Sequence, residues 1–210
     1  MKAASQSIYG PRELWLRRAF IAVCAVLLAE LMWQGLSVDF IAGRDFSIAL
    51  GLWSMRFLMI TVVISPVSRL LRRPSLKRWR RLLGLAAFAF AIGHAIHYVI
   101  YANIWPSSLH ILILRPYLLV GCIATVLLLV LAATSTDNMV RRLSPRAWRR
   151  LHTAIYLIVP LSVLHEVMAY GELLGEAGLY CVLTPLLALE RWFPGPATRR
   201  SRLDIAPAAR

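Results

Sequence analysis

The sequence predicts an all-α, polytopic membrane protein: a bundle of six transmembrane helices with both termini in the cytoplasm. Of the 210 residues, 59% are hydrophobic and only 16% are charged, whereas a soluble domain is about 45 to 50% apolar. Lys and Arg number 24 against 10 Asp and Glu, a net charge of +14. Because the basic residues form short clusters between long apolar runs, the excess indicates contact with membrane lipid and not with nucleic acid.

Six apolar runs are long enough to span a bilayer, which takes about 20 residues. They lie at 18–36, 47–67, 82–102, 117–134, 151–170 and 177–193. We therefore expect three regions, namely a cytoplasmic N-terminal segment, a six-span domain and a basic, disordered cytoplasmic tail, at 1–17, 18–193 and 194–210. The segments between the spans are short, 6 to 16 residues, and leave no room for a soluble catalytic domain.

The basic residues also predict the orientation, because cytoplasmic loops collect Lys and Arg. One side of the predicted membrane holds 21 of the 24, and the other holds only Arg44 and Arg115. The remaining one, Arg56, lies inside the second span. We expect a multi-pass protein of the bacterial inner membrane whose short outer loops face the periplasm.

Two charged residues lie inside the predicted spans, where charge is costly. Glu30 is about 12 residues into the outward-running first span, and Arg56 is about nine into the inward-running second. These positions correspond to similar depths. The simplest interpretation is a structural ion pair between them.

Two histidines suggest a cofactor. His94 in the third span and His165 in the fifth lie about 12 and about 14 residues from the cytoplasmic starts of two parallel helices. Their imidazoles can face each other in the outer half of the bilayer, as the two axial ligands of a b-type haem do. Because both axial positions would be filled, such a haem transfers electrons and does not bind oxygen.

The position of His152 raises the question of a second haem. It precedes His165 by 13 residues, a rise of about 20 Å along a helix. On an ideal helix the two side chains would be about 140° out of alignment, although Pro160 between them could kink the helix. The third span has no histidine at the matching depth, near 80–83, so a second haem would need an unusual sixth ligand.

The two remaining histidines carry weaker predictions. His97 is either a substitute ligand for His94 or a histidine hydrogen-bonded between helices. His110 follows Trp105-Pro106, which breaks the helix, so we assign it to the outer loop.

Arginines at the span ends could bind the haem propionates, which are carboxylates. On the outer side Arg115 is either a propionate ligand or an interfacial residue that extends toward water. On the inner side Arg80 and Arg81 could bind propionates, a flavin phosphate or an acidic partner, while most of the other inner arginines set the topology and attract anionic lipid.

Several short motifs occur in a recognisable order. They are Gly51-Leu-Trp53 with Arg56, Arg80-Arg81 and Gly84 leading to His94 and Tyr98, Arg115-Pro116-Tyr117 with Gly121, Leu131 to Ser135, and Arg141-Arg142-Leu143 followed by Trp148, His152, Tyr156 and His165. Together they resemble the ferric-reductase-like transmembrane domain, and within it the MsrQ/YedZ-type haem-binding membrane subunits of methionine sulfoxide reductase systems. The resemblance covers residues 51–192 and places the family's haem histidines at His94, His152 and His165.

The resemblance implies an electron-transfer subunit and not a self-contained enzyme. Electrons from quinol or a cytoplasmic flavin reductase would pass through haem b, with FMN also bound in some members, to a periplasmic molybdopterin enzyme that reduces oxidised methionine. No glycine-rich phosphate loop marks an FMN site in the sequence. Two alternatives stay open, which are a direct ferric or cupric reductase at the outer face and a small transporter or assembly factor without haem.

Overall fold

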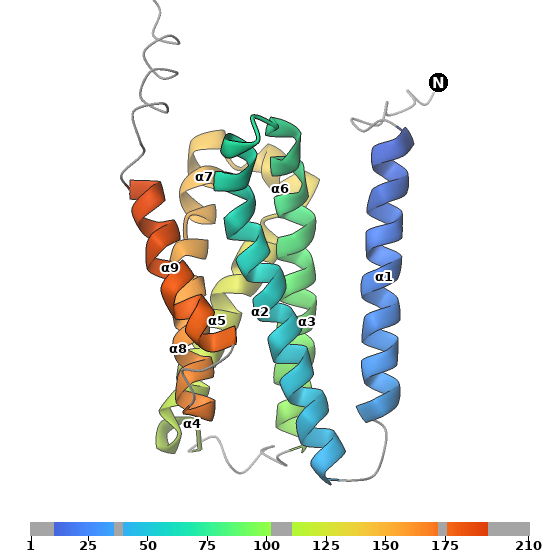
Figure 1. Ribbon diagram of the computed structural model, residues 1–210, viewed down its shortest axis with the longest axis vertical. Coiled ribbons are helices and arrows are strands. Elements are labelled where there is room, and N and C mark those ends of the chain that lie inside the picture. The colour runs from blue at the N-terminus through green and yellow to red at the C-terminus, as the bar shows by residue number, and fades with distance from the viewer. Residues whose placement is uncertain (1–10, 36–39, 102–110, 172–175, 193–210) are drawn as a thin grey trace, which may run out of the picture.

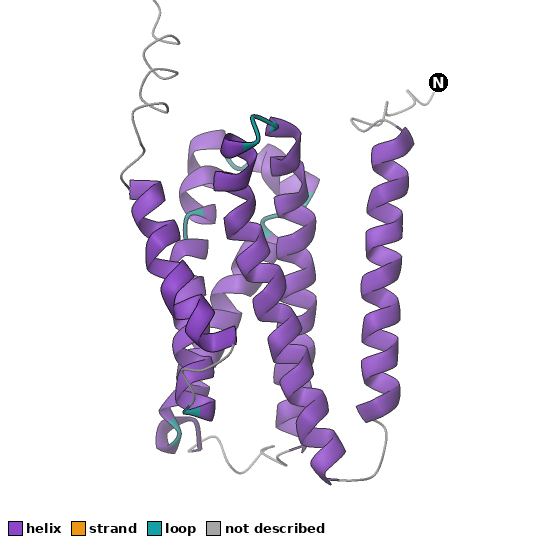
Figure 2. Ribbon diagram, in the orientation of Figure 1, coloured by secondary structure: helices purple, strands orange, loops and turns teal. Residues whose placement is uncertain are grey.

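The computed structural model describes residues 11–35, 40–101, 111–171 and 176–192, and within these ranges every regular element is helical (Figure 2). The long helices cover the six predicted runs. They are α1 (Pro11–Gly35), α2 (Phe40–Leu70), α3 (Trp79–Tyr101), α5 (Pro116–Ala133), α8 (Ile155–Tyr170) and α9 (Glu176–Trp192). Short helices connect them, namely η1 (Pro74–Arg78), α4 (Ile111–Leu114), α6 (Asp137–Arg142) and α7 (Pro145–His152).

Four stretches of the described chain are long and apolar enough to cross a membrane. They are Arg44–Leu70, Pro74–Ile100, Pro116–Ala133 and Pro145–Tyr170, and α9 contributes the shorter apolar stretch Glu176–Leu189. The chain is therefore a multi-pass membrane protein. The count of six spans and the cytoplasmic position of both termini remain predictions, and the segments 1–10 and 193–210 lie outside the described residues.

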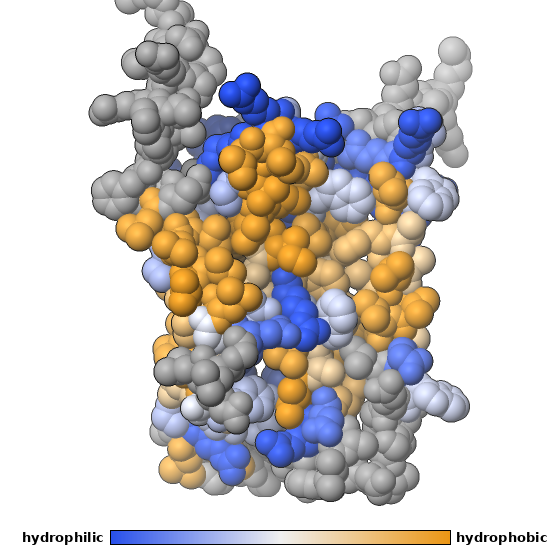
Figure 3. All heavy atoms as spheres, viewed as in Figure 1, coloured by the Kyte–Doolittle hydropathy of each residue, from blue (hydrophilic) through white to orange (hydrophobic). Residues whose placement is uncertain are grey.

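Successive long helices run in opposite directions, so the start of α1, the α2–η1–α3 connection, α6 and α7 all lie at one end (Figure 1). Exposed basic residues gather there, and we call it the basic end; they are Arg72, Arg73, Lys77, Arg78, Arg141, Arg142, Arg146, Arg149 and Arg150. A broad apolar belt lies below it in the space-filling view (Figure 3). This separation of charge from apolar surface is what a bilayer-spanning protein requires.

Helix α2 is the central element of the bundle. It packs along α3, where Ser54 Oγ donates a hydrogen bond of 2.9 Å to the backbone carbonyl of Ala87, and it also contacts α1, α8 and α9. Of the most deeply buried large side chains, Leu50, Leu58 and Phe90 belong to α2 and α3, and Ile158 belongs to α8. Helices α5 and α8 form a second closely packed pair. The bundle therefore consists of two helix pairs with comparatively few contacts between them.

The fifth predicted run is not one continuous helix. Helix α7 ends at His152 and α8 begins at Ile155, with a turn at Thr153 and Ala154 between them. Pro160 lies inside α8, and the kink that it could introduce there stays a prediction. Gly171 ends α8 with φ of 68°, a left-handed conformation that favours glycine.

Candidate functional site

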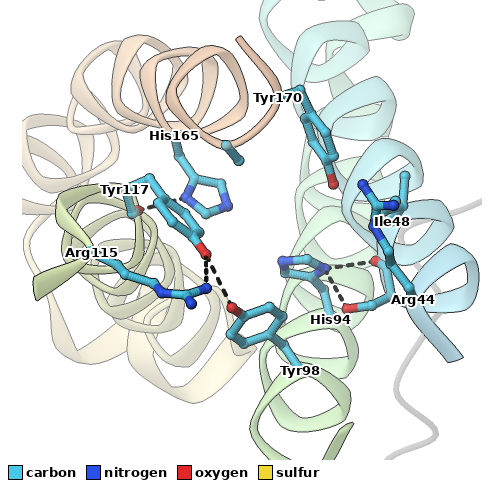
Figure 4. A pocket seen from close by; sticks show the side chains of 10 residues that line it. Arg44, Ile48, His94, Tyr98, Arg115, Tyr117, His165 and Tyr170 are labelled. Atoms are coloured by element: carbon cyan, nitrogen blue, oxygen red, sulfur yellow. Dashed lines mark hydrogen bonds between the residues drawn. The ribbon is translucent and has the colours of Figure 1, made fainter. Parts of the chain in front are cut away.

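A cavity of about 380 Å³ lies between the two helix pairs. Its walls are mainly aliphatic side chains of α2, α3, α5 and α8, and His94 and His165 line it from opposite sides. A smaller cavity of about 260 Å³ shares both histidines and adjoins it toward the end opposite the basic end (Figure 4). An apolar chamber with a few convergent polar groups is the usual form of a cofactor site.

The structure brings His94 and His165 together. Their ring centroids are 6.2 Å apart, and the ring planes are inclined at 76°. An imidazole nitrogen binds a metal at about 2 Å, so two imidazoles on opposite sides of one metal ion have ring centres about 6 Å apart. The observed separation fits that requirement.

Each of these histidines is held by a backbone carbonyl through Nδ1. His94 Nδ1 lies 2.7 Å from the carbonyl oxygen of Ser47, and His165 Nδ1 lies 2.7 Å from that of Tyr117. A carbonyl can only accept, so Nδ1 carries the hydrogen in both rings, and Nε2 of each neutral imidazole keeps its lone pair. A metal-binding histidine usually donates its other ring N–H to a carbonyl or carboxylate in this way.

Two arginines and three tyrosines surround the mouth of the cavity. Arg115 Nη1 donates to Tyr117 Oη at 3.3 Å, and the hydroxyls of Tyr98 and Tyr117 are 3.1 Å apart. Arg44 and Tyr170 lie across the opening in Figure 4. Cations and hydroxyls at the rim of an apolar chamber suit a ligand with an apolar body and anionic substituents.

His152 lies apart from this site, at the basic end. Its Nε2 is 3.3 Å from Thr134 Oγ1, and its ring stacks on Trp148 with centroids 4.0 Å apart. Trp148 Nε1 in turn donates to the backbone carbonyl of Thr134 at 3.1 Å. Arg80 is close enough to His152 to act on it electrostatically. The role of His152 and Arg80 in cofactor binding stays a prediction.

The other predicted site residues are placed as follows. Arg81 Nη1 donates to Asp137 Oδ1 at 2.5 Å and so connects α3 to α6. His97 packs its ring edge-on against Phe46, with centroids 4.4 Å apart, and does not line the two cavities described. His110 lies outside the described residues.

The expected ion pair between Glu30 and Arg56 is wrong. Arg56 on α2 instead binds Glu176 at the start of α9 with two hydrogen bonds, Nε to Oε2 at 3.0 Å and Nη2 to Oε1 at 2.5 Å. Tyr180 Oη donates to the same carboxylate at 2.9 Å, and Arg56 lies over the ring of Trp53. The carboxylate of Glu176 therefore lies beside the middle of α2.

Sequence reasoning missed the groups that support the two facing histidines. Ser47 and Tyr117 act mainly through their backbone carbonyls, which carry no residue-type signal, although Ser47 Oγ also lies 3.4 Å from His94 Nδ1. Tyr98 and Tyr170 could have been found, because tyrosines near the outer ends of the spans that carry the histidines are natural rim residues.

Comparisons with known proteins give a consistent family. The family described as ferric reductase like transmembrane component matches residues 47–163. The MsrQ haem-binding subunit of protein-methionine-sulfoxide reductase from Xanthomonas euvesicatoria is 39% identical over 99% of this chain and 97% of its own length.

Two further relatives differ in how much of them is matched. The MsrQ protein of Caulobacter vibrioides is 38% identical over 68% of this chain and 70% of its own length. The magnetosome protein MamZ of Paramagnetospirillum magneticum is 33% identical over 73% of this chain but only 25% of its own length. No solved structure gives a significant match.

Proposed function

This chain belongs to the ferric reductase like transmembrane component family, and from that premise we propose that it is the b-type cytochrome subunit of a bacterial methionine sulfoxide reductase system. It passes electrons from quinol or a cytoplasmic flavin reductase to a periplasmic sulfoxide reductase subunit. Its relatives from Xanthomonas euvesicatoria and Caulobacter vibrioides are named as haem-binding subunits of such reductases, which supports this assignment.

One observation carries the proposal, which is the facing pair of His94 and His165. Their ring separation of 6.2 Å and their two Nδ1 contacts to backbone carbonyls fit a pair of axial ligands. His94 and His165 would hold haem b, which would supply one-electron transfer when bound. The residues of the chain bind and orient the group, and the aliphatic walls exclude water from it.

The rim residues suit the propionates. Arg115 and Arg44 provide positive charge at the cavity mouth, and the hydroxyls of Tyr98 and Tyr117 provide hydrogen-bond donors. We therefore assign Arg115 to the propionates. Arg80, Arg81 and His152 at the basic end would serve the entry of electrons, through a second haem, a flavin phosphate or an acidic donor protein.

The direction of transfer follows from the distribution of charge. Exposed arginines at the basic end would face the cytoplasm and attract both anionic lipid and an acidic electron donor. The His94 and His165 end, where Arg44 and Arg115 line the smaller cavity, would then face the periplasm and the external partner. Single cysteines at Arg73 and at Asp45, in a variant without native cysteines, test this orientation, since only the second should react with an impermeant thiol reagent.

The absorption spectrum of the purified protein tests the assignment. We expect a low-spin b-type haem, with the number of haems per chain given by pyridine haemochrome analysis and any FMN revealed by flavin fluorescence of the extract. A purified, folded protein without a chromophore would instead favour the transporter or assembly-factor interpretation.

Reconstitution in nanodiscs tests the function itself. A quinol or reduced flavin donor should reduce the haem, and a periplasmic sulfoxide reductase with methionine sulfoxide should then reoxidise it. If the subunit alone reduced ferric chelates rapidly and left the sulfoxide reductase oxidised, a direct metal reductase would replace our proposal.

A further inference from the structure

The two facing histidines are held by the same local device on two different helices. On α2, the carbonyl of Ser47 accepts from His94, and Gly51 follows four residues later. On α5, the carbonyl of Tyr117 accepts from His165, and Gly121 follows four residues later. Residues four apart in an α-helix lie one above the other on the same face. A ring bonded to the first carbonyl therefore lies over the position of the second residue's side chain.

Glycine leaves that position free in both helices. A Cβ at Gly121 would lie 2.7 Å from His165 Nδ1 and 2.8 Å from its Cε1, well inside contact distance. A Cβ at Gly51 would lie 3.3 Å from His94 Nδ1 and 3.4 Å from its Cε1, which is tight but less severe. Any side chain at Gly121 would therefore push the His165 ring away from the Tyr117 carbonyl, and one at Gly51 would compress the corresponding contact.

Two other glycines show that this is not a general property of the bundle. A Cβ at Gly84 would come no closer than 3.9 Å to Thr61, and one at Gly93 no closer than 3.8 Å to Leu50, both ordinary contacts. Glycine within a helix costs about 1 kcal/mol relative to alanine. At Gly121 the close approach of an imidazole offsets that cost, since an alanine Cβ would overlap the ring, and at Gly51 the ring would have to shift by a few tenths of an ångström.

We infer that Gly51 and Gly121 are positioning residues, each of which forms, with the carbonyl four residues before it, a carbonyl–glycine pair that orients one haem ligand. The inference rests on the proposed function. The carbonyl fixes the hydrogen on Nδ1 and so leaves Nε2 as the ligating atom, and the glycine lets the ring approach closely enough for that hydrogen bond. Ser47–Gly51 orients His94, and Tyr117–Gly121 orients His165.

The two glycines should differ in how well they tolerate alanine, so the inference predicts effects of different size. Gly121→Ala should displace His165 and lower haem affinity about 10- to 100-fold, the range for loss of a group that orients a metal ligand. Gly51→Ala should retain more haem, with a shifted midpoint potential, because only a few tenths of an ångström separate its Cβ from an ordinary contact with His94. Gly93→Ala and Gly84→Ala are the matched controls and should keep the wild-type spectrum and potential.

The experiment compares the four alanine variants, purified as full-length protein in the same detergent. Haem content, the low-spin spectrum, the midpoint potential and carbon monoxide binding by the reduced protein are measured together with thermal unfolding. Carbon monoxide binding reports an open axial position, which a purely structural defect would not create in the haem-loaded fraction. If Gly121→Ala does not fold, the midpoint potentials of Gly51→Ala and Gly93→Ala are compared. A shift in Gly51→Ala alone supports the inference, and wild-type potentials in both overturn it.

A double-mutant cycle isolates the steric effect on the ring. In a His165→Gly background supplied with free imidazole, Gly121→Ala should cause little further loss, since an imidazole that is not attached to α8 can shift away from the added methyl group. An equal loss in both backgrounds, or a wild-type spectrum and potential in Gly121→Ala, would overturn the inference alone. A wild-type protein without haem would overturn the proposed function first and this inference with it.

Discussion

The two ends of the bundle hold their histidines in different ways. At the end away from the basic loops, His94 and His165 come from different helix pairs, face each other across a cavity, and bind backbone carbonyls through Nδ1. At the basic end, His152 stacks on Trp148 of its own helix and places Nε2 against the Thr134 hydroxyl. The first arrangement leaves Nε2 of each ring available for a ligand, whereas the second occupies it.

This difference shows what separates a prepared ligand from a packed histidine. A backbone carbonyl inside a helix is rigid, so a histidine bound to it is fixed in both tautomer and direction. A threonine hydroxyl can rotate and can either donate or accept, so it fixes neither. The end with two carbonyl-bound histidines is therefore the one prepared for a metal, and the other end would have to rearrange to bind one through Nε2.

The largest expected effect is the loss of haem when either facing histidine is removed. His94→Ala and His165→Ala should each abolish the low-spin spectrum, because one axial nitrogen leaves the iron incompletely ligated in an apolar cavity. Haem content and electron paramagnetic resonance of the purified variants measure this. A full-intensity low-spin spectrum in both variants would contradict the ligand assignment.

His97→Ala is the matched control for this comparison. His97 is one turn from His94 on α3 but packs against Phe46, away from the cavities. The variant should keep a nearly intact spectrum. Loss of haem in His97→Ala together with retention in His94→Ala would exchange the two roles.

The next largest effect concerns the ion pair that lies between the two ends. Arg56→Met removes both guanidinium hydrogen bonds to the Glu176 carboxylate, which keeps the hydrogen bond from Tyr180. The Arg56 and Glu176 side chains are 34% and 41% exposed, so we expect a loss of about 1 to 2 kcal/mol in the free energy of unfolding, at the low end for hydrogen bonds to a charged group. Equilibrium unfolding in mixed micelles measures it, and the spectrum of the His94–His165 site should change less than the stability.

The double variant Arg56→Met with Glu176→Gln tests whether the two side chains stabilise the protein as a pair. Removing both charges avoids an unpaired carboxylate, so this variant should be more stable than Arg56→Met alone. If the loss of stability in the double variant equals the sum of the losses in Arg56→Met and Glu176→Gln, the pair contributes no coupling energy.

The helices and the facing histidines could be predicted from the sequence because both follow from counting residues. Apolar runs of about 20 residues specify spans, and equal distances from two parallel span starts specify equal depth. The count to His94 follows the uninterrupted helix α3, and the count to His165 still gives the right depth although it crosses the short turn between α7 and α8. This prediction does not require knowing how the helices are rotated against each other, since two rings at the same depth that line the same cavity come together.

The partner of Arg56 and the break beside His152 could not be predicted in this way. Counting treats each span as crossing the whole bilayer, but α9 begins with Glu176 already beside Arg56. The turn at Thr153 and Ala154 has no glycine or proline to mark it. The carbonyl–glycine pairs depend on a close approach between helices, although a glycine inside each of two helices that face the histidines was a readable sign of it.

A smaller effect should follow from removing His152. His152→Ala loses the stacking on Trp148 and the contact with Thr134, which together contribute about 1 kcal/mol. The spectrum of the His94–His165 site should be retained, because the two sites lie at opposite ends of the bundle. Haem per chain and thermal unfolding are the measurements. Any fall in haem content with the first spectrum intact would report a second haem at the basic end, and loss of the first spectrum would contradict the separation of the two ends.

The smallest expected effect is a pH-dependent change in stability at the basic end, where Arg81 connects α3 to Asp137 at the start of α6. The hydrogen bond and the charge of Arg81 hold the pKa of the Asp137 carboxyl below its usual value. A lowered pKa in the folded state stabilises the protein above the unfolded-state pKa of about 3.9, and that stability is lost as the pH falls through the lower folded-state value.

Asp137→Asn should therefore unfold at a slightly lower temperature than the wild type from about pH 8 to about pH 5, and the difference should disappear once the carboxyl is protonated. The Asp137 side chain is 74% exposed, so the difference is small and should shrink further in high salt. Thermal unfolding across this pH range, with haem absorbance recorded in the same samples, measures it. Because Asp137 lies at the far end from His94 and His165, the haem spectrum should not follow the change. A difference in unfolding temperature that persists unchanged at pH 2 would exclude the carboxylate charge as its cause.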